Sequence, residues 1–412
     1  MSASVLTACR FCRAPLGNVC IDLGVSPLAN SYLRPDQLSA MEPFFPLRML
    51  VCPSCLLVQT EDFGTPETIF TDYAYFSSYS TTWVEHSRRY AEQVVARYGL
   101  TQEHRVVELA SNDGYLLQFF VQAGIPVLGV EPAANVAKVA LQKGIPTLVE
   151  FFGRRLGAEL GERTPASLLV GNNVLAHVPD INDFVAGMKL ALAPGGVITM
   201  EFPHLLNLLR LVQFDTIYHE HFSYLSLLAV RNVFAAHGLR IFNVEQLPTH
   251  GGSLRIHACH EGDDREAEPG LQVVASLEED AGMANLDTYL SLAGEAELEK
   301  RRILELLISL KALGSTIVGY GAPAKGTTLL NYCGIRSDFI DYTTDLSPEK
   351  QGLYLPGVRI PIRHPDEIAR TRPDYVFILP WNLREEIMEQ LAYIRDWGGR
   401  FIARAPSIQV FE

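Results

Sequence analysis

The sequence predicts an α/β protein with a cysteine-rich N-terminal module, a central doubly wound sheet of Rossmann-like type and a smaller α/β domain at the C-terminus. Three observations predict this fold class. Two C-x-x-C pairs lie within the first 55 residues, and short apolar runs alternate with helical periodicity through the middle of the chain. A second alternation of the same kind follows towards the end. Short buried runs separated by helices are typical of parallel sheets with right-handed crossovers.

Length and charge indicate the organisation and exclude several functions. At about 150 residues per domain, 412 residues predict roughly three domains, which we place at 1–70, 71–260 and 261–412. The 34 lysines and arginines against 47 aspartates and glutamates give a net charge of −13, which disfavours nucleic acid and anionic membranes as partners. No apolar run is long enough to span a membrane, and the first residues lack the layout of a signal peptide. We therefore expect a cytoplasmic protein, and a monomer as the default state.

The N-terminal module contains the most specific motif of the chain. Cys9-x-x-Cys12 and Cys52-x-x-Cys55 are two turns whose four thiolates can converge into the tetrahedral site that Zn²⁺ prefers. Because sulfur would fill every position, none remains for a catalytic water, and the zinc is expected to be structural. A redox pair and free buried thiols are the alternatives, and the presence of two pairs disfavours both. We expect zinc removal to unfold this module without stopping chemistry elsewhere in a folded chain.

A cofactor site is expected where the first strands of the central sheet end. An apolar run at 106–109 leads into the small-residue turn 110–114 (ASNDG) and then into a helix. The next strand ends at Glu131, which is placed to hold both hydroxyls of a ribose, and the third ends at Asn172 and Asn173. In a doubly wound sheet, ligands bind beyond these carboxyl ends. The turn lacks the G-x-G-x-x-G pattern of a dinucleotide site, although a nucleotide or dinucleotide remains an alternative.

These features resemble the class I S-adenosylmethionine (SAM) methyltransferases. The resemblance rests on an acidic residue in the first strand, an acidic end of the second strand and an L-x-P-G-G turn at 192–196 before the fifth. It implies SAM as the cofactor, with Glu131 on the ribose and Asn172 or Asn173 on the adenine side. The residues that would approach the methionine part are Glu108, Ala110, Asn112 and Gly114. The turn departs from the G-x-G-x-G usual in that family, which leaves the placement of the methionine carboxylate open.

A cluster of ionisable side chains follows the fifth strand. Tyr218-His219-Glu220-His221 occupies four consecutive positions, and in an extended segment the first and third would share one face and the second and fourth the other. A histidine beside a carboxylate and a phenol suits proton abstraction, whereas a zinc protease motif would need a helical histidine pair that is missing here. His177, at the end of the third strand, would project over the cofactor pocket. The alternative to a catalytic cluster is a loop whose polar side chains only make structural hydrogen bonds.

Two glycine-containing turns are candidate anion sites. The last domain opens with a strand, a turn that contains Gly321 and Ala322, and Lys325 at the start of a helix, so that helix amides and an ammonium group form a phosphate cradle. The run 249–255 (THGGSLR) contains Ser253 and ends at Arg255, which can hold a phosphate or a carboxylate. A simple turn is the alternative for the second run. Asp341, 20 residues past Gly321, keeps a dinucleotide site open for the first.

Across its whole length the chain resembles the sugar 3-C-methyltransferases. The resemblance rests on the four-cysteine module, the SAM domain with YHEHFSYLS, the run HGGSLR and the C-terminal GYGAPAKG, in this order. Enzymes of that family methylate nucleotide-linked 4-keto-deoxysugars in the biosynthesis of antibiotic and surface sugars. The resemblance implies a C-methyltransferase acting on a dTDP-4-keto-deoxysugar. A ketone at C4 acidifies the hydrogen on C3, so that a base can form an enolate that takes the methyl group.

The expected residue roles follow from this chemistry. His221 is the expected base, Glu220 orients it, and Tyr218 or His177 donates a hydrogen bond to the oxyanion at C4. A tyrosine of the hydroxyl-rich run 72–80 lines the pocket in that family; Tyr73 is our choice, and a simple linker is the alternative reading of the run. The expected substrate contacts are Lys325, Gly321, Ala322, Ser253 and Arg255.

Three other functions stay open at this point. A sugar O-methyltransferase would use the same base on a hydroxyl group. A bifunctional enzyme would also reduce the C4 ketone with NADPH. A non-enzymatic zinc scaffold or nucleic-acid module is disfavoured by the net charge and by the two cleft motifs.

Overall fold

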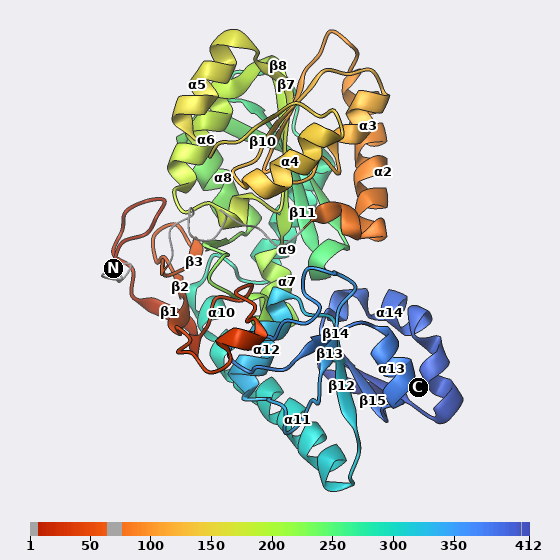
Figure 1. The fold of residues 1–412 in the computed structure, drawn as a ribbon. Helices are drawn as coiled ribbons and strands as arrows, with labels where there is room; N and C mark the ends of the chain where they lie inside the picture. Colours follow the sequence, from red (N-terminus) through yellow and green to blue (C-terminus); the bar gives the residue numbers. More distant parts are fainter. Residues whose placement is uncertain (1–6, 64–75, 405) are drawn as a thin grey trace.

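The computed structural model describes residues 7–63, 76–404 and 406–412 and confirms the α/β fold. In Figure 1 the central sheet and its helices form the upper part of the molecule and the C-terminal domain the lower part. The N-terminal module lies against the side where these two parts meet. Among the described helices, none is both long enough and apolar enough to cross a bilayer.

The N-terminal module is a small antiparallel sheet that shares a strand with the central part of the chain. Its own strands are β1 (Asn18–Ser26), β2 (Phe45–Val51) and β3 (Val58–Thr60). The fourth strand, β9 (Ser223–Tyr224), pairs with β3 and follows directly after the ionisable cluster. The cysteine-rich module is therefore hydrogen-bonded to the segment that carries His221.

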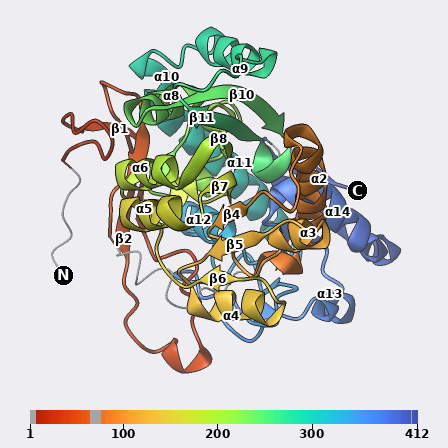
Figure 2. The same cartoon turned by 90° about the horizontal axis from the view of Figure 1, so that it is seen from above.

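The central sheet has seven strands in the order β10-β11-β8-β7-β4-β5-β6. Strands β4 to β8 run parallel, and β11 lies antiparallel between β8 and β10. Figure 2 shows α5 and α6 on one side of the strands and α2 and α3 on the other. The strands are β4 (Val106–Leu109), β5 (Val127–Val130), β6 (Thr147–Leu148), β7 (Ala166–Asn172), β8 (Leu192–Pro203), β10 (Leu239–Leu247) and β11 (Ser253–His260). The helices are α2 (Thr81–Tyr98), α3 (Leu117–Gln122), α4 (Ala134–Gln142), α5 (Arg154–Arg163), α6 (Ile181–Ala191), α7 (Leu205–Arg210) and α8 (Leu227–Ala236).

The C-terminal domain is a second, smaller wound sheet with the strand order β14-β13-β12-β15-β16-β17. All its strand pairs are parallel except that of β17 with β16. The strands are β12 (Ile317–Tyr320), β13 (Thr343–Thr344), β14 (Ile362–Arg363), β15 (Tyr375–Ile378), β16 (Arg400–Arg404) and β17 (Ile408–Phe411). The helices of this part are α10 (Leu286–Leu290), α11 (Leu292–Ala312), α12 (Ala324–Cys333), α13 (Asp366–Thr371) and α14 (Arg384–Gln390).

Most predicted elements occur where the sequence indicates them. Helix α2 begins after Ser80, whose hydroxyl accepts a hydrogen bond from the Trp83 amide at 3.3 Å, and it ends at Gly99 with a φ of 61°. The stretch 261–280 is polar and shows no clear helical pattern in the sequence, yet it contains α9 (Pro269–Asp280). This helix buries only Val274 and Glu278, so its apolar stripe is too narrow to be recognised.

One hydrophobic core joins the N-terminal module to the C-terminal domain. Its fully buried side chains include Met49 of β2, Ile303 of α11, Leu330 of α12 and Ile402 of β16. The parts therefore pack as one body. The domain boundaries at 70 and 260 stay predictions.

Candidate active site

The four predicted zinc ligands lie together. Their sulfur atoms are all within 4.8 Å of one another, with Cys9 Sγ 3.6 Å from Cys55 Sγ and Cys12 Sγ 3.5 Å from Cys52 Sγ. A tetrahedral Zn²⁺ with bonds of about 2.3 Å separates its sulfur ligands by about 3.8 Å, so this cluster fits the ion. The hydrogen bond between Cys55 and Cys9 lowers the pKa of Cys9 and raises that of Cys55, so Cys9 is the thiol of this pair that ionises first.

The predicted cofactor turn has a left-handed backbone held by the next strand. Ala110, Asn112 and Gly114 have φ values of 56°, 50° and 78°. The glycine is required, because a Cβ at position 114 would lie 2.3 Å from Cδ1 of Ile145. The main-chain amide of Asn112 donates to Oε2 of Glu131 at 2.9 Å, which ties the turn to the end of β5.

The acidic and amide side chains at this sheet edge fit SAM. Glu131 also accepts a hydrogen bond at Oε1 from the Ala133 amide at 2.8 Å, and a carboxylate oxygen can accept more than one bond, so both oxygens can also take ribose hydroxyls. Burial raises the pKa of Glu131, and these two amides oppose that effect. Oδ1 of Asp113 and Oδ1 of Asn173 are buried and accept no hydrogen bond from a described residue. These unused acceptors match a ligand rich in hydroxyl and amino groups.

Two further predicted cofactor residues are buried at the same edge. Glu108 is fully buried, which raises its pKa well above the usual range, and neither of its carboxylate oxygens has a hydrogen-bond partner among the described residues. Asn172 Nδ2 lies 3.5 Å from the Tyr115 hydroxyl. The two buried Glu108 oxygens are therefore free to accept hydrogen bonds from a ligand.

The ionisable cluster is a tight turn, which corrects the expected extended arrangement. The His221 amide donates to the Tyr218 carbonyl at 3.0 Å, so these two side chains face each other instead of pointing to opposite sides. The Tyr218 hydroxyl lies 2.7 Å from Nε2 of His221, and Nδ1 of His221 lies 3.2 Å from the Thr216 carbonyl. Since a carbonyl only accepts, Nδ1 carries the proton and Nε2 accepts from Tyr218. Burial, with the field of His177, lowers the pKa of His221 well below its usual value, so the ring is neutral.

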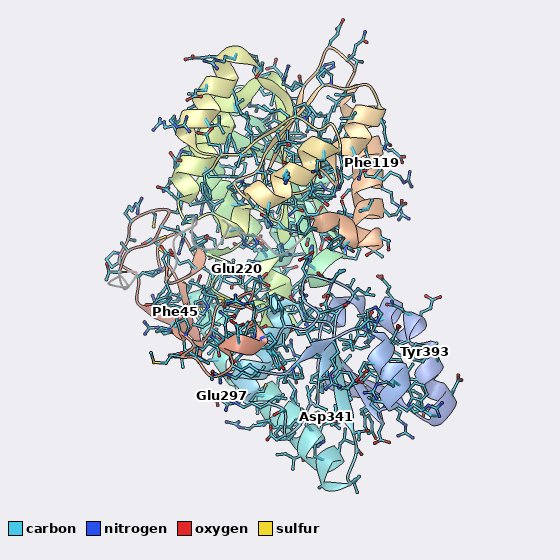
Figure 3. The ribbon with its side chains drawn as sticks, viewed as in Figure 1. Phe45, Phe119, Glu220, Glu297, Asp341 and Tyr393 are labelled. Carbon is cyan, nitrogen blue, oxygen red and sulfur yellow. The ribbon has the colours of Figure 1, made fainter. Side chains whose placement is uncertain are left out.

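Glu220 does not orient His221, which corrects the expected role of its carboxylate. Both carboxylate oxygens accept from Nδ2 of Asn30, at 2.8 and 2.7 Å, and Asn30 belongs to the N-terminal module. Burial raises the pKa of Glu220 to about 7, and the hydrogen bonds from Asn30 oppose the shift. Figure 3 shows Glu220 near the middle of the molecule, between the central sheet and the C-terminal domain. The Thr216 carbonyl takes over the orienting contact to His221.

His177, which the sequence places over the cofactor pocket, lies beside Tyr218 and His221. It ends the short 3₁₀ helix Leu175–His177, and its ring centroid is 4.7 Å from that of His221. Its Nδ1 donates to the Glu220 carbonyl at 2.8 Å, and burial lowers its pKa to about 4. A neutral ring whose proton sits on Nδ1 presents no proton at Nε2. This geometry corrects the expectation that His177 donates to an oxyanion.

Lys325 faces the same space from the C-terminal domain. Its Nζ donates to Oδ1 of Asn382 at 2.6 Å and lies 4.8 Å from the centre of the Trp381 ring. Burial lowers its pKa to about 8. Burial lowers the pKa of His221 and that of His250, and the positive charge of Lys325 adds to both shifts, which indicates that the lysine lies near both rings.

The glycine turn beside Lys325 is held from two sides. Gly321 has a φ of 87°, and a Cβ there would lie 2.5 Å from Cδ of Pro380. The Ala322 amide donates to Oδ2 of Asp345 at 2.7 Å, and its carbonyl accepts from the Tyr32 hydroxyl at 2.6 Å. The acid that contacts the turn is therefore Asp345, which follows β13. Asp341, the acid noted in the sequence, precedes that strand.

Arg255 and Ser253 point into the protein, which corrects their expected role as substrate contacts. Arg255 is 2% exposed, and its guanidinium pairs with Glu201 at 2.7 Å and with Glu245 at 3.2 Å. Ser253 donates to the Thr249 carbonyl at 3.0 Å. The arginine thus fixes β11 to β8 and β10 instead of offering a free cation.

Several site residues could not be recognised in the sequence. Asn30, Thr216, Trp381 and Asn382 carry no motif, because their roles depend on contacts between distant segments. His250 belongs to the glycine run noted above; it has a φ of 53°, and its contact at 2.9 Å with Asn173 places it beside the predicted cofactor site. Tyr73, the predicted pocket tyrosine, lies outside the described residues.

Comparisons with known proteins agree with this arrangement. Residues 83–244 match the family "Methyltransferase domain", residues 248–406 the family "C-methyltransferase C-terminal domain" and residues 9–70 the family "Putative zinc binding domain". C-methyltransferase NovU from Streptomyces niveus is 38% identical over 403 residues, which are 98% of this chain and 96% of that protein. The chain belongs to the C-methyltransferase family. This C-methyltransferase is therefore SAM-dependent, and transfer to carbon replaces the O-methyltransferase alternative.

Two solved methyltransferase structures that resemble this C-methyltransferase each cover less than half of it. Magnesium protoporphyrin IX methyltransferase from Synechocystis PCC 6803 is 14% identical over 42% of this chain and 78% of its own, with a TM-score of 0.33. CcbJ methyltransferase from Streptomyces caelestis is 13% identical over 42% of this chain and 89% of its own, also with a TM-score of 0.33. The assignment rests on NovU and on the family matches.

Proposed function

We propose that this C-methyltransferase methylates C3 of a dTDP-linked 4-keto-deoxysugar through an enolate, in the biosynthesis of an antibiotic deoxysugar, as the sequence resemblance implies. The observation that carries the proposal is the pair of His221 and Tyr218. It is a neutral imidazole with a fixed tautomer, hydrogen-bonded to a phenol, on the side of the cleft that faces Lys325. A proton acceptor opposite a cation suits a substrate with an acidic C–H bond and an anionic tail.

The proposed SAM contacts lie at the carboxyl ends of β4, β5 and β7. Glu131 would hold the ribose hydroxyls, and Asn172 or Asn173 the adenine side. Glu108, Ala110, Asn112 and Gly114 are proposed for the methionine part. When bound, SAM supplies an electrophilic methyl group on a sulfonium sulfur.

His221 is the proposed proton acceptor, and Tyr218 connects it to the sugar. The phenol oxygen takes the proton from C3 while its own proton passes to Nε2 of His221, over the 2.7 Å that separates them. The electron pair of the C–H bond moves into the C3–C4 bond, and the ketone oxygen becomes the enolate oxygen. C3 is then the nucleophile for the methyl group. The Thr216 carbonyl stabilises the protonated imidazole by accepting from Nδ1.

Lys325 is the proposed contact for the diphosphate. Because Lys325 is partly buried, water competes less strongly with an anion for its ammonium group. The two groups that it contacts, Asn382 and the face of Trp381, are neutral, so its charge is available to an anion. The turn with Gly321 and Ala322 would pack beside the same group. A cation at this position overcomes locally the repulsion that a net charge of −13 imposes on an anionic substrate.

Product analysis tests the proposal. The purified enzyme is incubated with SAM and a panel of nucleotide-linked 4-keto sugars, without any nicotinamide cofactor, and products are followed by mass spectrometry and ¹³C NMR. We expect one added methyl group bonded to C3 that survives acid hydrolysis and ether cleavage. A methyl ether, or turnover only when NADPH is present, would contradict the proposal. A substrate whose C4 ketone is already reduced is the matched control and should not react.

A further inference from the structure

We propose that Asn30, a residue of the zinc-binding module, is a positioning residue for methyl transfer because it holds the carboxylate of Glu220 in the active site. The inference rests on the proposed function in one respect, namely that the turn 218–221, which contains Glu220, carries the proton-accepting pair of Tyr218 and His221. It assigns the zinc-binding module a part in the active site, beyond that of a remote structural unit.

The contact between the two side chains is direct and partly buried. One amide nitrogen of Asn30 donates to both oxygens of Glu220, at 2.8 and 2.7 Å. Glu220 is 3% exposed. Among the described residues, the hydrogen bonds from Asn30 are the influences that lower the pKa of Glu220, against the burial that raises it.

The segment around Asn30 is fixed between the other two parts of the molecule. On one side of Asn30, the Ala29 carbonyl accepts from the Thr327 hydroxyl at 3.1 Å. On the other, the Tyr32 hydroxyl donates to Ala322 at 2.6 Å, and Leu33 exchanges two main-chain hydrogen bonds with Tyr354 at 3.0 and 2.9 Å. The segment is thus anchored to the C-terminal domain on both sides of the residue that reaches Glu220.

The same segment is connected to the zinc cluster through the small sheet. It follows β1, which pairs with β2, and β2 pairs with β3 on either side of the turn that carries Cys52 and Cys55. Strand β3 in turn pairs with β9, which follows Glu220 in the chain. The zinc-binding module therefore holds the catalytic turn twice, once through main-chain pairing and once through Asn30.

The charged and titratable groups that face Glu220 predict what the loss of Asn30 would do. Tyr32 faces it from the N-terminal module, and His177 binds its main-chain carbonyl; Tyr218, His219 and His221 adjoin it in the chain. None of these is a cation at neutral pH in its buried setting: burial raises the pKa of Tyr32 and lowers those of the three histidines. Lys350, which lies over the Tyr32 ring, is paired with Asp345 at 3.6 Å. Without Asn30, the carboxyl group therefore becomes protonated and free to turn.

Titration of Glu220 itself is the first test, because it needs no substrate. Glutamate labelled with ¹³C at Cδ is followed by NMR, with Glu220→Gln to assign the resonance. We expect a midpoint near pH 7 in the wild-type enzyme and a rise of at least about one pH unit in Asn30→Leu. Asn30→Asp keeps the shape and should raise the midpoint as well, since two carboxylates then share one site. Ser31→Ala, which alters an exposed neighbour bonded to the Leu28 carbonyl, is the control and should leave it unchanged.

A double-mutant cycle then tests positioning against a merely structural role. Asn30→Leu should lower kcat about tenfold to a hundredfold in the wild-type background, and less than about threefold in the Glu220→Gln background. Zinc content and SAM affinity should stay unchanged. Equal losses in both backgrounds, or an unmoved Glu220 titration, would overturn the inference. Failure of the proposed function gives a different result: the titration shifts as expected, but the wild-type enzyme does not methylate the sugar nucleotide.

Discussion

The pH dependence of substrate use is expected to follow the ionisation of Lys325. Burial lowers its pKa to about 8, so the side chain is about 90% charged at pH 7 and about 10% charged at pH 9. If Lys325 binds the diphosphate, kcat/KM should fall about ninefold over this range, because this ratio reports the free enzyme. Lys325→Arg keeps its charge and should abolish the fall. The kcat/KM of Lys325→Met should not change with pH and should be about tenfold to a hundredfold lower than that of the wild type at pH 7.

The same burial predicts the effect of Lys325→Met on stability. The folded-state pKa lies below the unfolded value of 10.5, so the cost of burying the charge is complete below about pH 8 and disappears as the pH rises towards 10.5. The difference between the folded and unfolded pKa values of Lys325 corresponds to about 3 kcal/mol, which is the stability that the variant gains by losing the buried charge. The variant also loses the hydrogen bond to Asn382 and the contact with Trp381, and these losses remove roughly 2 kcal/mol of the gain. The variant should therefore be slightly more stable at pH 7, by about 1 kcal/mol.

Steady-state kinetics at pH 7, 8 and 9 and thermal unfolding at pH 7 measure these effects, with SAM affinity as the control. A wild-type kcat/KM that stays constant from pH 7 to 9 would refute the reasoning. So would a Lys325→Met enzyme that retains the pH dependence of the wild type.

Three further predictions concern the rest of the structure. Arg404→Met should lower the free energy of unfolding by about 3–5 kcal/mol, because it leaves Asp215, its fully buried partner at 2.6 Å, uncompensated; an unchanged Tm would contradict this. Glu131→Ala should weaken SAM binding about tenfold or more in calorimetry while the fold, followed by circular dichroism, is retained; unchanged affinity would exclude the ribose contact. Contrary to the expectation from the sequence, removal of zinc by a chelator should stop methyl transfer as well as unfold the N-terminal module, because this module pairs with β9 and holds Glu220; full activity at zero measured zinc would contradict this.

Local patterns explain why so much of the fold could be predicted from the sequence. The spacing of Cys9, Cys12, Cys52 and Cys55 defines the metal cluster, and the apolar runs define strands whose carboxyl ends meet at one sheet edge. The position of Glu131 follows from the same rule. Helix α9 could not be recognised because few of its side chains are buried, so the hydrophobic periodicity of its sequence is weak.

Side-chain partners were harder to predict, because they depend on how distant segments meet. The composition at 218–221 indicated proton chemistry, but whether Tyr218 faces His221 depends on the turn, and the turn is fixed by strand pairing with residues far away in the sequence. Arg255 looked like a free cation because the sequence does not show that Glu201 and Glu245 lie beside it. Asn30 had no signal, since its role exists only through a contact with Glu220 across 190 residues of chain.

Formation of a C3 carbanion by His221 is the central claim, and exchange of the C3 hydrogen tests it most directly. The enzyme is incubated in D₂O with a dTDP-4-keto-deoxysugar and S-adenosylhomocysteine, which cannot donate a methyl group, and deuterium at C3 is measured by ¹H NMR and mass spectrometry. The wild-type enzyme should exchange this hydrogen, and His221→Ala should do so about a hundredfold to ten-thousandfold more slowly while still binding SAM. Exchange and methylation at the wild-type rate in His221→Ala would contradict the account.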